Sequence, residues 1–169
     1  METNTNLVKI FEYALNQEKT GMSFFQSSLE RMGIGSAVTA FKKLISEEQR
    51  HIDFITGIIQ DLKSGSEINI ENKMIDTISP TNYFDERSKQ EFLEQCVHGS
   101  MIPDVTIFNT AYLIEKDLSE FYARMAEKTA GQASKALSML SAWEKEHEKF
   151  FKEYRDRLSE EYSQMPWGG

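Results

Sequence analysis

Two segments of the chain each carry a glutamate followed three residues later by a histidine, and both residue types bind metal ions. Glu48 and His51 lie in AFKKLISEEQRH, and Glu144 and His147 lie in ALSMLSAWEKEH. Residues three apart share one face of a helix, so each pair can point at a single ion. Carboxylate and imidazole ligands suit iron or manganese, whereas a soft-metal site built from thiolates has no ligands here.

A single further glutamate precedes each pair by 29 or 30 residues. These are Glu18 in NQEKTGMSFF and Glu115 in LIEKDLSEFY. Burying carboxylates is very costly unless they are paired or bind metal, and two divalent cations would neutralise four of them. The predicted ligands of a two-metal site are therefore Glu18, Glu48, His51, Glu115, Glu144 and His147.

Four segments with apolar residues at helical spacing must position these side chains. The predicted helices cover residues 7–32, 36–63, 103–131 and 134–159. In the first segment Phe11, Ala14, Glu18 and Phe25 lie on one stripe, and the other ligands lie on similar stripes. All six ligands are therefore expected to face the interior.

Short connections between consecutive helices predict two antiparallel helical hairpins. At a rise of ~1.5 Å per residue, Glu18, Glu48 and His51 lie roughly 21–26 Å from the turn at Ile34. The three ligands of the second hairpin lie at a similar height above the turn at Gly131. Antiparallel packing therefore brings the ligands of each hairpin to one level.

The two hairpins also resemble each other in sequence. Glu18 maps onto Glu115 at an offset of 97 residues, and the Glu-x-x-His pairs map onto each other at an offset of 96. The simplest account is a duplicated hairpin. We predict a single domain over residues 1–169, with hairpins at 7–63 and 103–159, a crossover at 64–102 and a tail at 160–169. Within the crossover, SGSEINIENK is predicted to be loop and DERSKQEFLEQCV a short helix.

The composition, 40% hydrophobic and 27% charged, is typical of a soluble globular protein. A net charge of −8 with dispersed Lys and Arg argues against nucleic acid as a partner. The longest apolar runs are too short to span a membrane, and METNTNLVKIFEY lacks the pattern of a signal peptide. Cys96 is the one cysteine, which excludes an internal disulfide and fits a reducing compartment. We therefore expect a cytoplasmic protein with no membrane partner.

The less specific alternative is that these glutamates are ordinary surface residues. One Glu-x-x-His motif in a glutamate-rich helix carries little information, and we expect Glu47, Glu146 and Glu148 to be solvated and His98 to be structural. The set of six is different, because it requires matched heights and inward faces as well as the motifs. Gly33-Ile34-Gly35-Ser36 lacks the third glycine of a dinucleotide fingerprint and the lysine of a phosphate-binding loop.

Taken with the segments IEKDLSEFY and FKKLISEEQRH, the ligand pattern resembles the ferritin-like di-iron carboxylate superfamily, and within it the rubrerythrin-related branch. The resemblance covers the four helices. It implies an all-α fold, a ferritin-like four-helix bundle with one long crossover, built from two similar helical hairpins. It also implies a centre of two iron ions, with manganese or zinc as alternatives. Glu48 and Glu144 would bridge the ions, and each ion would have one terminal glutamate and one histidine, from the set Glu18, Glu115, His51 and His147.

Two departures from full rubrerythrins affect the expected activity. Those proteins carry a four-cysteine rubredoxin module that delivers electrons, whereas this chain has one cysteine, so a separate electron donor protein is expected. Leu118 occupies the place of an additional glutamate on the third helix. The remaining six-ligand set is similar to the ferroxidase centre of bacterioferritins, which favours iron oxidation.

The leading hypothesis is a rubrerythrin-like di-iron oxidoreductase of ferroxidase or peroxidase type. Its partners would be ferrous iron and either oxygen or hydrogen peroxide. The alternatives are an iron binding or storage protein acting in a larger assembly, and a structural metal-binding bundle. A homo-oligomer is expected, with a dimer as the starting hypothesis.

Tyr122 is the candidate catalytic residue beside the metal site. It lies two helical turns beyond Glu115 on the same stripe, and its counterpart in the first hairpin is Phe25. A buried phenol usually finds a hydrogen-bond partner. In rubrerythrin-like proteins a tyrosine at a similar place donates to a metal-bound carboxylate, and a hydroxyl that reaches solvent or a backbone carbonyl is the alternative.

Overall fold

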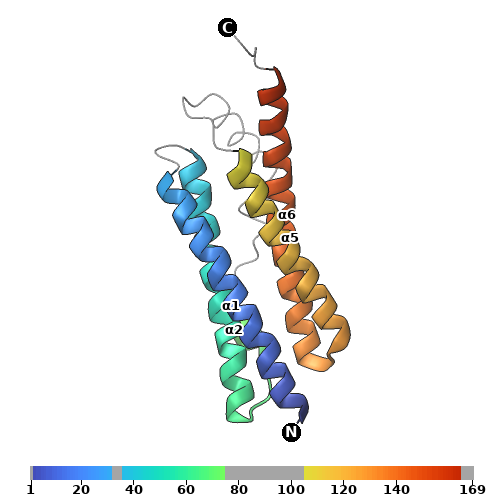
Figure 1. The fold of residues 1–169 in the computed structure, drawn as a ribbon. Helices are drawn as coiled ribbons and strands as arrows, with labels where there is room; N and C mark the ends of the chain where they lie inside the picture. Colours follow the sequence, from blue (N-terminus) through green and yellow to red (C-terminus); the bar gives the residue numbers. More distant parts are fainter. Residues whose placement is uncertain (1, 32–35, 75–104, 165–169) are drawn as a thin grey trace.

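The computed structural model describes residues 2–31, 36–74 and 105–164, and four long helices account for most of them (Figure 1). These are α1 (Glu2–Arg31), α2 (Ser36–Ser64), α5 (Val105–Lys128) and α6 (Gly131–Gln164). The described ranges contain no strand. The predicted all-α class is confirmed.

The helices form two antiparallel pairs that lie side by side, α1 with α2 and α5 with α6 (Figure 1). In this view α1 ends and α2 begins at the upper end of the bundle, whereas α5 ends and α6 begins at the lower end. The chain leaves α2 at the lower end and enters α5 at the upper end, so these two helices run in the same direction. This confirms a four-helix bundle of two paired hairpins, and most of the predicted crossover at 64–102 lies outside the described residues.

The last helix departs most from its predicted limits. It begins at Gly131, three residues before the predicted start at Ser134, and continues to Gln164, so half of the predicted tail is helical. Gly131 has a φ of 61°, a conformation that costs glycine little and other residues more. The turn is closed by the Ser134 hydroxyl, which donates to the carbonyl oxygen of Ala126 at 2.8 Å.

The predicted loop SGSEINIENK is partly wrong, because it contains the start of a short helix, α3 (Ile70–Met74). Ile68 and Ile70 are buried against the lower part of the bundle, which anchors this segment. Lys73 on α3 also forms an ion pair with Asp61 on α2. The predicted helix at 85–97, Cys96 and His98 lie outside the described residues.

Two hydrophobic clusters fill the bundle above and below the level of the predicted ligands. Glu18 lies seven residues from Phe11 in the lower cluster and seven from Phe25 in the upper one. In the upper cluster the rings of Phe25 and Phe151 stack with centroids 5.9 Å apart. Burying one such side chain contributes about 1.5–3 kcal/mol, so the clusters hold the four helices at a fixed spacing around the ligands.

The helices are amphipathic, with charged residues between the buried positions. None of the described helices combines the length and the apolar character that crossing a bilayer requires.

Candidate metal centre

The fold brings all six predicted ligands into one buried cluster in the middle of the bundle. Their ligand atoms form two groups, each with all atoms within 4.8 Å of one another. One group is Glu18, Glu48, His51 and Glu144, and the other is Glu48, Glu115, Glu144 and His147. Glu48 and Glu144 belong to both groups, which is the arrangement that two bridging carboxylates require.

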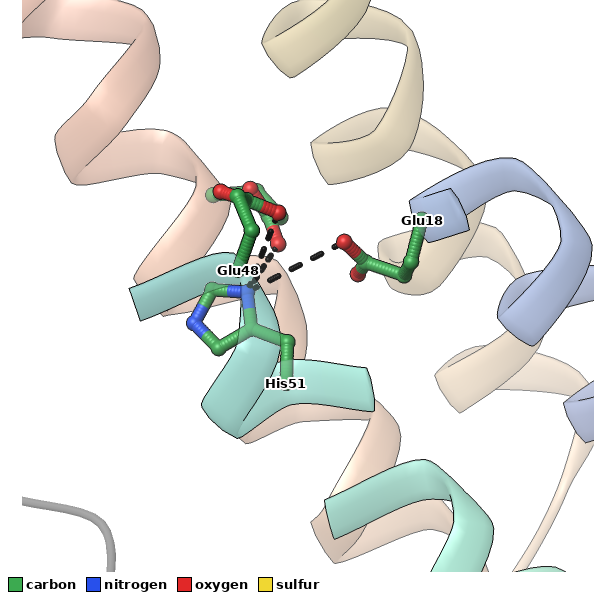
Figure 2. A group of neighbouring side chains, drawn as sticks. Glu18, Glu48 and His51 are labelled. Carbon is green, nitrogen blue, oxygen red and sulfur yellow. Dashed lines mark ion pairs between the residues drawn. The ribbon is translucent and has the colours of Figure 1, made fainter. Parts of the chain in front are cut away.

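Each of the four long helices supplies at least one of these side chains. Figure 2 shows the first group, in which Glu18 reaches from α1 toward the imidazole of His51 on α2. His51 Nδ1 lies 4.0 Å from Glu18 Oε2, 3.7 Å from Glu48 Oε2 and 2.6 Å from Glu144 Oε1. One nitrogen therefore faces carboxylates from three different helices.

His147 on α6 is placed in the same way in the second group. Its Nδ1 lies 3.1 Å from Glu48 Oε1, 3.7 Å from Glu115 Oε2 and 3.5 Å from Glu144 Oε2. The two imidazole rings are nearly parallel, with centroids 5.6 Å apart. Each histidine thus directs the same ring nitrogen at the shared carboxylates.

The donor atoms of the cluster fit a pair of metal ions. Buried polar groups in proteins are nearly always hydrogen-bonded. Here both oxygens of Glu115 and of Glu144, and Nδ1 of both histidines, have no hydrogen-bond partner although they are buried. Carboxylate oxygens and imidazole nitrogens that lie close together without forming hydrogen bonds are typical of ligands that point at a common metal ion. A set of oxygen and imidazole nitrogen ligands suits iron, manganese or zinc.

In the metal-free protein the pKa values of the four carboxyl groups shift in two directions, although all four groups are buried. Burial, together with the charges of Glu144 and Glu48, raises the pKa of Glu18 and of Glu115 well above 4.5. Burial also acts to raise the pKa of Glu144, but the charge of His51 and the close polar groups of Glu115 and His147 outweigh it and bring that pKa well below 4.5. The pKa of Glu48 is lowered in a similar way by the histidines.

The pKa values of the two histidines are raised, although burial by itself would lower them. Burial would lower the pKa of His51, yet the charges of Glu144 and Glu48 raise it from 6.5 to about 10. For His147 burial is again outweighed, by contacts with Glu115, Glu144, Glu47 and Glu48, and its pKa lies well above 6.5. Protons therefore balance the buried charge when no metal does, and metal must displace them.

Comparison with known protein families agrees with this geometry. The family model for rubrerythrin matches residues 9–155, which include most of each of the four long helices and all six predicted ligands. The chain belongs to the rubrerythrin family. A search of curated proteins and a search of solved structures each found no match. The family and the buried cluster together indicate a site for two metal ions.

In this rubrerythrin-family protein Tyr122 lies beside the carboxylates of the site, as the sequence predicts. The side chain is fully buried, and its hydroxyl donates a hydrogen bond to Glu18 Oε1 at 2.5 Å. Burial and the charge of Glu18 raise the pKa of Tyr122 well above 10, so the phenol keeps its proton. The acceptor comes from the other hairpin, because Glu18 is on α1 and Tyr122 on α5.

The prediction that Glu47 is solvated is wrong. Its side chain is buried, and its carboxylate contacts Nε2 of His147, the nitrogen that faces away from the shared carboxylates. The sequence contained a signal for this, because the repeat maps Glu47 onto Trp143, an aromatic residue typical of an inward position. The centre therefore holds five buried glutamates, one more than two divalent cations neutralise.

The remaining acidic neighbours lie nearer the surface, as predicted. The side chain of Glu146 is 43% exposed and pairs with Lys149 on the same helix. Glu148 is half-buried and is not among the carboxylates that contact His147 in the described part of the chain. Leu118, at the place of the additional glutamate of full rubrerythrins, is buried in the lower hydrophobic cluster.

Proposed function

We propose that this protein is a di-iron carboxylate oxidoreductase that oxidises ferrous iron or reduces hydrogen peroxide or oxygen. The observation that supports this most strongly is the buried set of four carboxylates and two imidazoles, because most of the donor atoms that face one another have no hydrogen-bond partner. Bound iron would supply the electrons for the oxidant. Membership of the rubrerythrin family makes iron the first metal to test.

In this proposal each residue of the chain has a defined task. Glu48 and Glu144 would hold both ions, because each belongs to both ligand groups. Glu18 with His51, and Glu115 with His147, complete the two ligand sets. The hydrophobic clusters on either side limit the access of bulk water, which strengthens electrostatic interactions inside the site.

The electron source is a separate part of the proposal. The 169 residues contain one cysteine, so they cannot form the four-cysteine rubredoxin module. A separate electron donor protein would then restore the ferrous state after each turnover. We also propose that the protein acts as a homo-oligomer, with a dimer as the smallest form.

The test is to load the metal-free protein with ferrous iron without oxygen and then to add oxygen or hydrogen peroxide. We expect the near-ultraviolet absorbance of ferric carboxylate to rise faster than in buffer that contains iron alone. The ratio of the rate with oxygen to the rate with hydrogen peroxide identifies the preferred oxidant. Absence of any acceleration by the protein would reject the oxidoreductase, and particles of shell size in light scattering would favour iron storage.

Tyr122→Phe tests the role of the phenol. The variant loses only the hydroxyl that donates to Glu18, so the fold and the content of bound iron are expected to stay. Loss of a partner that holds a metal ligand typically costs 10–100-fold in activity, and we expect iron oxidation to slow by about 10-fold. Stopped-flow absorbance measures the rate.

The matched control is Tyr154→Phe, which removes a buried phenol from the upper aromatic cluster, where Tyr154 stacks on Phe108. The control should oxidise iron at the wild-type rate. Equal rates in all three proteins would show that the phenol of Tyr122 has no part in the reaction.

A further inference from the structure

The two halves of the metal centre differ at one position of the internal repeat. The offset of 96 residues that maps Glu48 onto Glu144 and His51 onto His147 also maps Glu47 onto Trp143. One half therefore has a carboxylate where the other has an indole. Both side chains contact a histidine of the site, but each contacts the histidine of the opposite hairpin.

In the first case both nitrogens of an imidazole face carboxylates. His147 Nδ1 faces the shared carboxylates, with Glu48 Oε1 at 3.1 Å, while Nε2 contacts Glu47. A carboxylate that accepts the hydrogen of the outer nitrogen leaves the lone pair of the inner nitrogen for a metal, fixes the ring and makes the ligand more basic. Glu47 also brings a negative charge to this side of the centre.

In the second case an aromatic ring, rather than a carboxylate, contacts the imidazole from the outer side. Trp143 stacks on His51 with ring centroids 5.2 Å apart and an interplanar angle of 15°. An indole has no acceptor for an imidazole N–H and carries no charge. Within the described ranges, every carboxylate that pairs with His51 does so through Nδ1, whereas Glu47 pairs with Nε2 of His147.

The two terminal glutamates also differ, and Glu115, in the group of His147, is the better donor to a metal ion. Glu18 accepts the hydrogen bond of Tyr122, which withdraws electron density from one of its oxygens. Neither oxygen of Glu115 has a hydrogen-bond partner, so both are free to bind an ion. The two stronger terminal donors, Glu115 and His147, thus lie in the same ligand group.

We propose that Glu47 makes the two metal positions unequal, so that the position of Glu115 and His147 fills first and the position of Glu18 and His51 fills second. Glu47 acts through His147 and is a positioning residue. The inference rests on the proposed function only in requiring that the cluster bind two ions. It assigns an order of binding to two sites that the ligand set alone would make equivalent.

Nitrogen NMR of histidine-labelled protein, titrated with zinc ions, tests the order directly. The chain has three histidines, and His98→Asn and His51→Asn variants assign their signals. At one equivalent of zinc we expect the Nδ1 signal of His147 to move to its bound position while that of His51 stays in place. The second equivalent should then move the signal of His51.

Glu47→Gln keeps the size of the side chain and removes its charge. We expect zinc affinity at the His147 position to fall 10–100-fold and the order of filling to be lost. Glu148→Gln is the matched control, because it removes the same charge one residue from His147 without removing a contact to it, and the order should remain. The melting temperature of each metal-free variant shows that it is folded.

The outcomes separate this inference from the proposed function. If both histidine signals move together in the wild-type protein, or if Glu47→Gln keeps the wild-type order, two ions still bind and only the inference fails. If zinc moves neither signal, both the two-metal site and the inference fail.

Discussion

Replacing Glu144 with alanine is expected to remove both metal ions from the protein. Its carboxylate belongs to both ligand groups, and it lies 2.6 Å from His51 Nδ1 and 3.5 Å from His147 Nδ1. The substitution therefore takes a ligand from each position at once. Without the cation, buried Glu18 and Glu48 repel each other unless one of them binds a proton. Glu48→Ala should behave in the same way.

Metal analysis after gel filtration measures this effect. We expect two ions per chain in the wild-type protein and close to none in Glu144→Ala. Glu146→Ala is the control, since Glu146 lies on the same helix with its side chain 43% exposed, and it should keep both ions. A Glu144→Ala protein that retains two ions would show that this residue does not bridge, and one retained ion would assign it to a single position.

Metal is also expected to raise the melting temperature by about 10 °C or more at neutral pH. An ion at a hundred times its dissociation constant adds about 2.7 kcal/mol to the free energy of unfolding. Two such ions add about 5 kcal/mol, and in a chain of this size 1 kcal/mol raises the melting temperature by about 2–4 °C. Differential scanning fluorimetry with and without zinc ions measures the difference.

The difference should widen as the pH rises. Without metal, Glu18 and Glu115 have a raised pKa, so the stability that their protons provide is present below 4.5 and is lost as the pH rises through the folded-state pKa. His51 acts in the same direction, since its contribution is complete below 6.5 and is lost as the pH rises through about 10. Metal competes with these same protons, so its stabilising effect grows over this range.

The carboxyl groups with a lowered pKa reduce the stability of the metal-free protein at the acidic end of the pH range. The contributions of Glu48 and Glu144 are present above 4.5 and are lost as the pH falls through the folded-state pKa. The metal-free protein should therefore be most stable in mild acid, between these two regimes. Equal melting temperatures with and without metal at neutral pH would count against a buried site, as would a difference that narrows as the pH rises.

The six residues of the buried cluster could be brought together from the sequence because helix geometry is regular. A rise of ~1.5 Å per residue fixes the height of Glu18 relative to His51 once the turn between them is short. The apolar stripes then fix the direction of each side chain. The repeat supplied an independent check, because Glu115, Glu144 and His147 had to satisfy the same relations, and the structure places them accordingly.

Features outside this regularity were predicted less well. Glu47 adjoins Glu48 on the inward side of α2, and the width of that face depends on how closely α6 packs, which the spacing of residues does not give. The short helix at Ile70–Met74 is held by burial of Ile70 and by the pair of Lys73 with Asp61, both of which are tertiary contacts. Tyr122 was placed correctly on its stripe, but its acceptor on the opposite hairpin was identified only by the fold.

The centre takes its ligands from α1, α2, α5 and α6, and this has a consequence for the turnover of the chain. Ions bound at this site would join the two hairpins, so the hairpins could not separate until several ligands had left the metal. Resistance to proteases is then set by the rate of metal release, because cleavage requires an opened chain. Under metal starvation newly made chains lack this link and are expected to be degraded first, so the cellular level of the protein would follow the supply of its metal.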